Sequence, residues 1–176
     1  MTTNYLESIK KQFVYYKLLG DKTFVQLTDE KLFWQYNEES NSIAIIVKHL
    51  SGNMLSRWTD FLTTDGEKPT RNRDGEFIDG SETKEQLIVL WTNGWEVFMN
   101  TLYSLTENDL MKTVTIRSEK LTVMQALNRQ TAHYAYHIGQ IVFLAKHLKN
   151  NEWQWLSIPK NKSNEHLKTS YLNNLK

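Results

Sequence analysis

The amino-acid sequence predicts an all-α fold, an up-down bundle of four helices. Only two prolines, Pro69 and Pro159, occur in 176 residues, so long stretches of chain contain no helix breaker. In those stretches apolar residues recur every three or four positions, which is the spacing of one face of an α-helix. The length suits one domain, which we expect over residues 1–160, with a polar and loose tail over residues 161–176.

Each helix has its own pattern, and the starts of two of them are marked by capping residues. The four helices are expected over residues 4–27, 41–61, 81–102 and 122–148. The second starts at Asn41 or Ser42, both of which are favourable N-cap residues. Thr122 and Gln125 form a Thr-x-x-Gln capping box that begins the fourth helix.

Three segments are expected outside the helices. Residues 114–116 and 121–123 alternate in polarity and are rich in β-branched side chains, which predicts a short β-hairpin before the fourth helix. Residues 63–80 form a long charged loop, and loops of this length are typically functional or disordered. After the fourth helix, Trp153 and its apolar neighbours are expected to pack back on the bundle.

Charge and composition exclude several classes of partner. The 21 basic and 20 acidic residues nearly cancel, so the sequence has no electrostatic footprint of a nucleic-acid-binding or membrane-surface protein. No apolar run reaches the roughly 18 residues of a membrane helix, and the N-terminal segment carries charges, so we expect a cytoplasmic protein. Because there is no cysteine, any metal must be held by nitrogen and oxygen ligands.

Histidines are the main functional signal. His133 and His137 are four residues apart, so a helix places both imidazoles on one face, and His49 lies in the apolar second helix. Together they predict a site of three nitrogen ligands for a metal ion. His147 lies about 15 Å further along the fourth helix, too far to join that site, and is expected to be structural or at the surface. His166 lies in the polar tail and has no expected role.

Two interpretations of this cluster follow from the residues alone. The histidines are either metal ligands or core side chains satisfied by hydrogen bonds. The small side chains of Gly52, Asn53 and Ser56 follow His49 along its helix, so we expect open space and a pocket beside it.

The arrangement of these motifs resembles the DinB-like superfamily of metal-dependent four-helix bundles. His49 in the second helix and His133-x-x-x-His137-x-Gly139-Gln140 in the fourth carry the resemblance, which covers about residues 4–150. Residues 48–54, 57–61, 71–77 and 156–159 resemble, more narrowly, a bacterial branch of unassigned function.

This resemblance implies a divalent metal on His49, His133 and His137. In characterised relatives, a low-molecular-weight thiol such as bacillithiol or mycothiol is transferred to an electrophile. Zinc and nickel suit a site of three imidazoles, and such a site keeps a position open for a reactant. The superfamily often has an arginine directly after the second histidine of the pair, where this chain has Ile138.

Three functions are therefore expected in order of preference: a metal-dependent thiol transferase acting on a small molecule, a metal-dependent hydrolase, and a non-catalytic, stress-related binding protein. Asn53, Ser56 and Gln140 are poor bases, so no catalytic residue is assigned, and this weakens the hydrolase. The oligomeric state stays open, with a homodimer as one alternative.

Arginines provide the candidate cofactor-binding residues. Arg71 and Arg73 in the charged loop could bind carboxylates of a thiol cofactor, and the alternative is that both are solvated. Arg57 is a similar candidate, with pairing to Asp60 at the surface as the preferred alternative. The loop itself is expected to lie over or beside the open side of the metal site.

Overall fold

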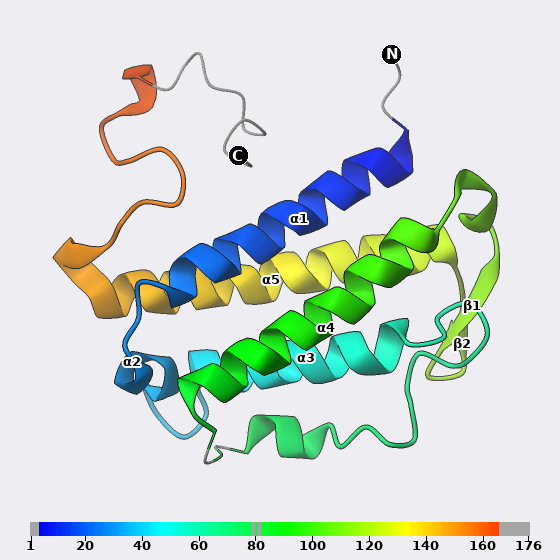
Figure 1. Cartoon of the computed structure of the whole chain (residues 1–176), viewed down its shortest axis with the longest axis horizontal. Coiled ribbons are helices and arrows are strands. Elements are labelled where there is room, and N and C mark those ends of the chain that lie inside the picture. The colour runs from blue at the N-terminus through cyan, green and yellow to red at the C-terminus, as the bar shows by residue number, and fades with distance from the viewer. Residues whose placement is uncertain (1–3, 79, 81, 166–176) are drawn as a thin grey trace.

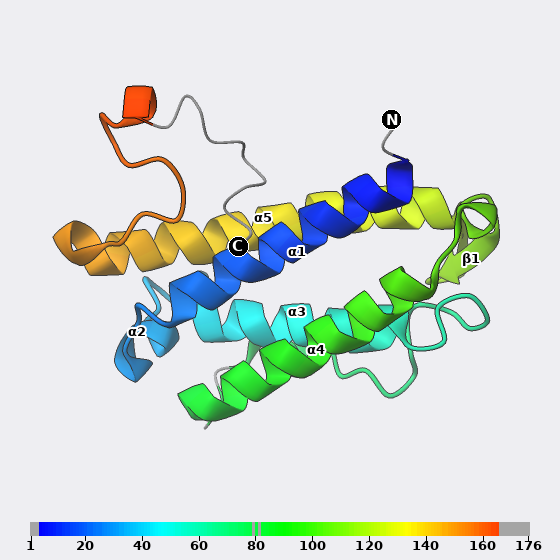
Figure 2. The same cartoon turned by 45° about the horizontal axis from the view of Figure 1, so that its top comes forward.

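The chain folds into a helical bundle with one small antiparallel sheet. The structure is a computed structural model that describes residues 4–78, 80 and 82–165. Its α-helices are α1 (Tyr5–Phe24), α2 (Asp29–Phe33), α3 (Ile43–Trp58), α4 (Lys84–Ser104) and α5 (Val123–Lys149). Short 3-10 helices, η1 to η4, lie at Asp74–Phe77, Glu107–Asp109, Asn150–Glu152 and Ser163–Glu165. In both views, α1 runs beside α5 and α3 beside α4 (Figure 1 and Figure 2).

The helix boundaries differ from the expected ones at three places, each for a local reason. Helix α1 ends at Phe24 rather than at residue 27, because the N–H groups of Gln26 and Leu27 bond three residues back and close a tighter turn. Thr28 is then extended, as the N-cap of the unexpected short helix α2. Helix α3 ends at Trp58 because Thr59 is extended and Asp60 has a φ of 49°. Helix α4 begins at Lys84 and not near residue 81, which lies outside the described residues.

The start of α4 is set by a capping box that mirrors the one predicted for α5. The Thr83 hydroxyl accepts a hydrogen bond from the Gln86 backbone N–H, and the Gln86 side chain accepts one from the Thr83 backbone N–H. The predicted box of Thr122 and Gln125 is present at α5, with the two hydrogen bonds at 2.8 and 3.1 Å. Short-range side-chain chemistry therefore starts both helices.

The predicted hairpin is confirmed as β1 (Thr113–Ile116) and β2 (Glu119–Thr122). Arg117 and Ser118 form its two-residue turn with φ values of 54° and 64°, as a type I′ hairpin turn requires. The Asp65 carboxylate accepts hydrogen bonds from both turn N–H groups at 2.9 Å. Backbone N–H groups of Glu67 and the turn hold the pKa of Asp65 below its usual value. The charged loop thus fixes the hairpin, and the hairpin presents Arg117 to the site.

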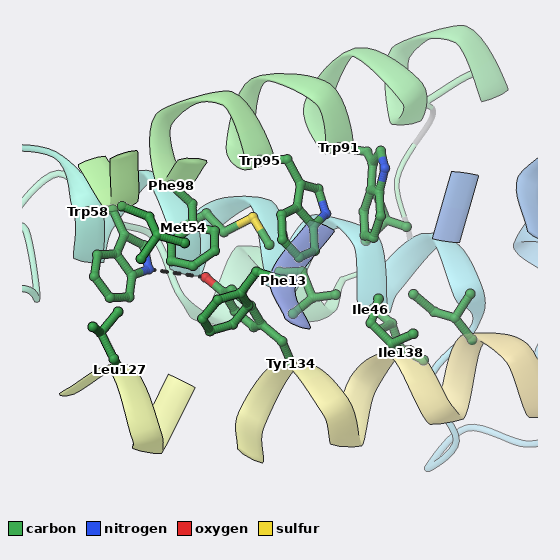
Figure 3. Close-up of a cluster of buried hydrophobic side chains, with 14 of the residues drawn as sticks. Phe13, Ile46, Met54, Trp58, Trp91, Trp95, Phe98, Leu127, Tyr134 and Ile138 are labelled. Carbon is green, nitrogen blue, oxygen red and sulfur yellow. Dashed lines mark hydrogen bonds between the residues drawn. The ribbon is translucent and has the colours of Figure 1, made fainter. Parts of the chain in front are cut away.

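Aromatic side chains form the centre of the core and hold α5 against α3 and α4 (Figure 3). The largest of these fully buried aromatics are Phe13, Trp58, Trp91, Trp95, Phe98 and Tyr134. The Trp58 indole N–H donates to the Tyr134 hydroxyl at 3.2 Å, which satisfies two polar groups inside the core. The adjacent His133 on α5 lies with its ring 5.4 Å from that of His49 on α3.

The segment after α5 packs on the bundle over its first residues. Trp153 is buried. The Gln26 side chain accepts a hydrogen bond from the Gln154 backbone N–H at 2.8 Å and donates one to the Gln154 carbonyl at 3.1 Å. Lys146 lies 4.1 Å from the centre of the Trp155 ring. Most of the tail expected to be loose, residues 166–176, lies outside the described residues. Within the described part of the chain, no helix has both the length and the apolar character to cross a membrane.

Candidate metal centre

Three imidazoles from two helices meet at one point. His49 on α3 lies with its Nε2 3.3 Å from Nε2 of His133 on α5, and Nε2 of His137 lies 3.1 Å from the same atom. The candidate ligand atoms all lie within 4.8 Å of one another. His49 and His137 are buried, with exposed fractions of 6% and 8%.

These separations fit a metal ion. A zinc ion with nitrogen ligands at about 2.05 Å in tetrahedral geometry places each pair of nitrogens about 3.3 Å apart. The two measured separations, 3.3 and 3.1 Å, are close to that value. The donor set therefore suits a divalent ion that prefers nitrogen ligands. Both separations are also hydrogen-bond distances, but a neutral His133 has one Nε2–H at most, which can point at only one of the two neighbouring nitrogens. Hydrogen bonding within the core therefore accounts for one of the two close contacts, whereas a metal ion accounts for both.

A buried carboxylate orients His49. Its Nδ1–H donates to Glu76 Oε2 at 3.0 Å, which leaves Nε2 as the free donor atom for a metal. Glu76 in η1 also accepts from Arg71 Nε at 2.8 Å and from Arg71 Nη2 at 2.9 Å. Burial alone would raise the pKa of Glu76, but the hydrogen bonds from His49 and Arg71 outweigh it and hold that pKa below its usual value.

Gly52 makes this contact available. It lies one turn after His49 on α3, and a β-carbon at this position would overlap the Glu76 carboxylate. A glycine here lets the carboxylate lie against the helix backbone and reach the imidazole of His49. The expected pocket beside His49 is present, since Gly52, Asn53 and Ser56 line two cavities there, but Glu76 occupies the space next to the Gly52 α-carbon.

The two histidines of α5 are held by glutamines one turn away. Gln140 Oε1 accepts from His137 Nδ1 at 2.8 Å, so His137 also has its Nε2 free. Gln130 Nε2 lies 3.0 Å from His133 Nδ1, an arrangement that puts the His133 proton on Nε2. Coordination through His133 Nε2 therefore requires the proton to move to Nδ1 and the Gln130 amide to turn so that its oxygen accepts it.

Both α5 histidines are neutral at physiological pH. Burial, together with His137 and His49, lowers the pKa of His133 to about 3. Burial and His49 lower the pKa of His137 to about 4, against the opposing effect of Gln140. Neutral imidazoles are the form that binds a metal, so the site does not need to lose protons from these rings at neutral pH.

A cavity of about 170 Å³ opens beside the histidines, with His49, His133 and Asn53 in its wall. The other lining residues are all five arginines of the sequence: Arg57, Arg71, Arg73, Arg117 and Arg129. None of the described carboxylates lines this cavity, which we call the arginine cavity. A second cavity of about 660 Å³ shares Arg71 with it and has Gly52 and Ser56 in its wall.

Two expectations about the arginines are wrong. Arg57 is not a surface partner of Asp60: it is 6% exposed and points from α3 toward α5, with Nη1 3.4 Å from Gln130 Oε1. Arg71 is not a solvated loop residue, since its side chain is 4% exposed and paired with Glu76 and Glu67. Both errors arise because neither the sequence spacing nor the composition shows which loop packs over α3.

Of the other residues considered in the sequence, some lie beside the site and others do not. Arg73 is exposed and lies over the Phe77 ring at 5.3 Å, at the rim of the arginine cavity. His147 is exposed, near Trp34 and away from the triad, and His166 lies outside the described residues. Loop residues 71–77 do lie beside the site, with the Phe77 ring 4.9 Å from that of His49.

Sequence reasoning missed Glu76 and Gln130 as partners of the histidines. Gln130 precedes His133 by three residues, a one-turn spacing that could have identified it, just as Gln140 follows His137 by three. Glu76 is 27 residues from His49, and no local pattern connects the two.

Comparison with known proteins places the chain in a family. No curated protein matches the sequence. A family model described as "Protein of unknown function (DUF1572)" matches residues 1–162, which include the whole bundle and the segment packed on it after α5. The chain therefore belongs to the DUF1572 family, which is a DinB-like family.

Proposed function

We propose that the protein is a divalent-metal-dependent enzyme that transfers a low-molecular-weight thiol to an electrophilic small molecule. The proposal takes the four long helices as an up-down bundle of the DinB-like type, with zinc or nickel held by His49, His133 and His137. The observation that carries it is the convergence of three Nε2 atoms at the edge of a cavity rich in arginine.

A divalent ion held there would favour the thiolate form of a bound thiol, which supplies the nucleophile that a chain without cysteine lacks. The protein's own residues would contribute orientation. Glu76 and Gln140 hold two imidazoles in the required tautomer, and the arginine cavity provides cations for an acidic cosubstrate such as bacillithiol.

The same lining disfavours the hydrolase. Hydrolysis benefits from a general base that can take a proton from water, and none of the described carboxylates lines the arginine cavity. The nearest acid, Glu76, already accepts hydrogen bonds from His49 and Arg71 and has a lowered pKa. A transferase needs less proton chemistry, because its nucleophile arrives as a thiolate.

Metal analysis is the first test. Elemental analysis of protein purified without an affinity tag should find about one divalent ion per chain. His137→Ala should lose most of that metal with its helical circular dichroism intact, whereas His147→Ala, on the same helix, should keep it. Equal metal content in His137→Ala and the wild type would refute the ligand assignment.

The reaction class is tested on metal-loaded protein. It is incubated with a model electrophile, with and without candidate thiols, and conjugate and hydrolysis product are measured separately. Conjugation that needs both metal and thiol supports the transferase. Hydrolysis without thiol would favour the hydrolase, and neither product across a broad panel would favour a non-catalytic binding protein.

A further inference from the structure

The arginines of this protein all lie around one cavity. The 21 basic residues include five arginines, and all five line the arginine cavity, while none of the described lysines does. Arginine differs from lysine in having a planar fork of donors that matches the two oxygens of a carboxylate or phosphate. A cavity that collects every arginine of the chain has the composition of an oxyanion site.

Three of these arginines are already compensated. Arg71 is paired with Glu76 and Glu67, Arg117 donates to Glu67 at 3.0 Å, and Arg129 donates to Glu119 at 3.0 Å. None of these three carboxylates lines the cavity itself. The pairs hold the guanidinium groups in position, as expected for the walls of a binding site.

Arg57 is different, because it is buried without a counterion. Among the described residues, no carboxylate lies within 4.0 Å of its guanidinium, and its one hydrogen bond is the long contact of Nη1 with Gln130. Its Nε is buried and has no hydrogen-bond partner in the described part of the chain. Burial lowers the pKa of Arg57, yet an arginine keeps its charge in proteins.

A buried, unpaired charge is costly to the fold, and proteins retain one where a ligand completes it. We propose that Arg57 is the centre of a binding site for the carboxylate or phosphate group of a small molecule, with Arg73 and Asn53 closing the site from the rim and from α3. The inference rests on the proposed function for its catalytic meaning, and it deepens that function by placing the acidic group of the substrate or cosubstrate on Arg57.

The size and place of the cavity limit that molecule. A volume of about 170 Å³ is below the roughly 300–1,000 Å³ of sites that enclose a drug-sized ligand, so the cavity holds an acidic head group and not a whole large ligand. His49 and His133 line the same cavity. In a ligand bound here, the carboxylate or phosphate group would therefore be separated by only a few bonds from the ligand atom that lies next to the histidines.

The test measures binding of inorganic phosphate and of acetate at constant ionic strength by isothermal titration calorimetry. The protein is first treated with an insoluble chelating resin, because soluble chelators are themselves polycarboxylates and phosphate binds metal ions. This binding experiment uses neither metal nor thiol. A negative transferase assay would therefore not contradict anion binding at Arg57, and a lack of anion binding would not contradict the assignment of the metal ligands.

Wild-type protein should bind at least one of the two anions saturably, and the tighter one identifies the head group. Arg57→Met keeps most of the side-chain volume and should weaken binding by about 10- to 100-fold. Lys120→Met removes an exposed cation of the neighbouring hairpin, outside the cavity, and should bind as the wild type does. Arg57→Lys keeps the charge without the fork and should show an intermediate loss, which provides the test if Arg57→Met does not fold.

Absence of saturable binding in the wild type would overturn the proposal. So would an Arg57 variant that binds within twofold of the wild type, or an equal loss in Lys120→Met, which would mark general surface charge as the cause.

Discussion

Replacing Glu76 with glutamine should weaken metal binding at a site that Glu76 does not itself ligate. The carboxylate accepts hydrogen bonds from His49 Nδ1 at 3.0 Å and from two nitrogens of Arg71 at 2.8 and 2.9 Å. A glutamine has one acceptor oxygen, and its amide nitrogen must face a donor. Either His49 or Arg71 then loses its partner, and the His49 ring is no longer held with Nε2 toward the other two imidazoles.

The expected loss is large enough to measure. Outer partners of metal-ligating histidines typically contribute about 10- to 100-fold to metal affinity, or about 1.4 to 2.8 kcal/mol. Separately, loss of a buried hydrogen bond to a charged group lowers the free energy of unfolding by about 1.5 to 3 kcal/mol. We therefore expect Glu76→Gln to lower both the affinity for zinc and the free energy of unfolding.

The assay is competition for zinc between the protein and a chromophoric chelator, with chemical denaturation run in parallel. Glu152→Gln is the matched control, since Glu152 forms an exposed ion pair with Lys149 at the far end of α5. The control should match the wild type in both measurements. A folded Glu76→Gln with wild-type zinc affinity would show that the carboxylate does not orient His49 for a metal.

Three further predictions follow from the same geometry. Gly52→Ala should push the Glu76 carboxylate away from α3 and lower zinc affinity in the same competition assay, while Gly139→Ala, where a β-carbon meets nothing within 4 Å, should not. Tyr134→Phe leaves the buried Trp58 N–H without an acceptor and should cost about 1 to 3 kcal/mol in denaturant unfolding, with metal content unchanged. Metal-depleted protein should lose stability as pH falls below about 6.5, because the pKa values of His133 and His137 are lowered to about 3 and 4 and only the unfolded chain takes up these protons. Each histidine contributes at most about 1.4 kcal/mol per pH unit, and thermal unfolding that is flat between pH 6.5 and 4.5 would contradict the lowered pKa values.

Local patterns in the sequence were sufficient to predict the long helices and the hairpin. The three-and-four spacing of apolar residues predicted the long helices, and Thr122 with Gln125 predicted the start of α5, because capping and helical periodicity depend on residues within one or two turns. Alternation in residues 114–123 predicted the hairpin for the same reason. The i,i+4 spacing of His133 and His137 was enough to place both on one helix face, where their Nε2 atoms lie 3.1 Å apart.

Tertiary packing decided what surrounds those two histidines. His49 is 84 residues from His133, and Glu76 is 27 residues from His49, so neither contact has a signature in local periodicity. The burial of Arg57 and Arg71 likewise depends on how the loop after α3 folds back. A helix encodes which of its side chains share a face, but the partner of that face is chosen by the packing of the whole chain, and here that packing joined three histidines, one carboxylate and every arginine into one site.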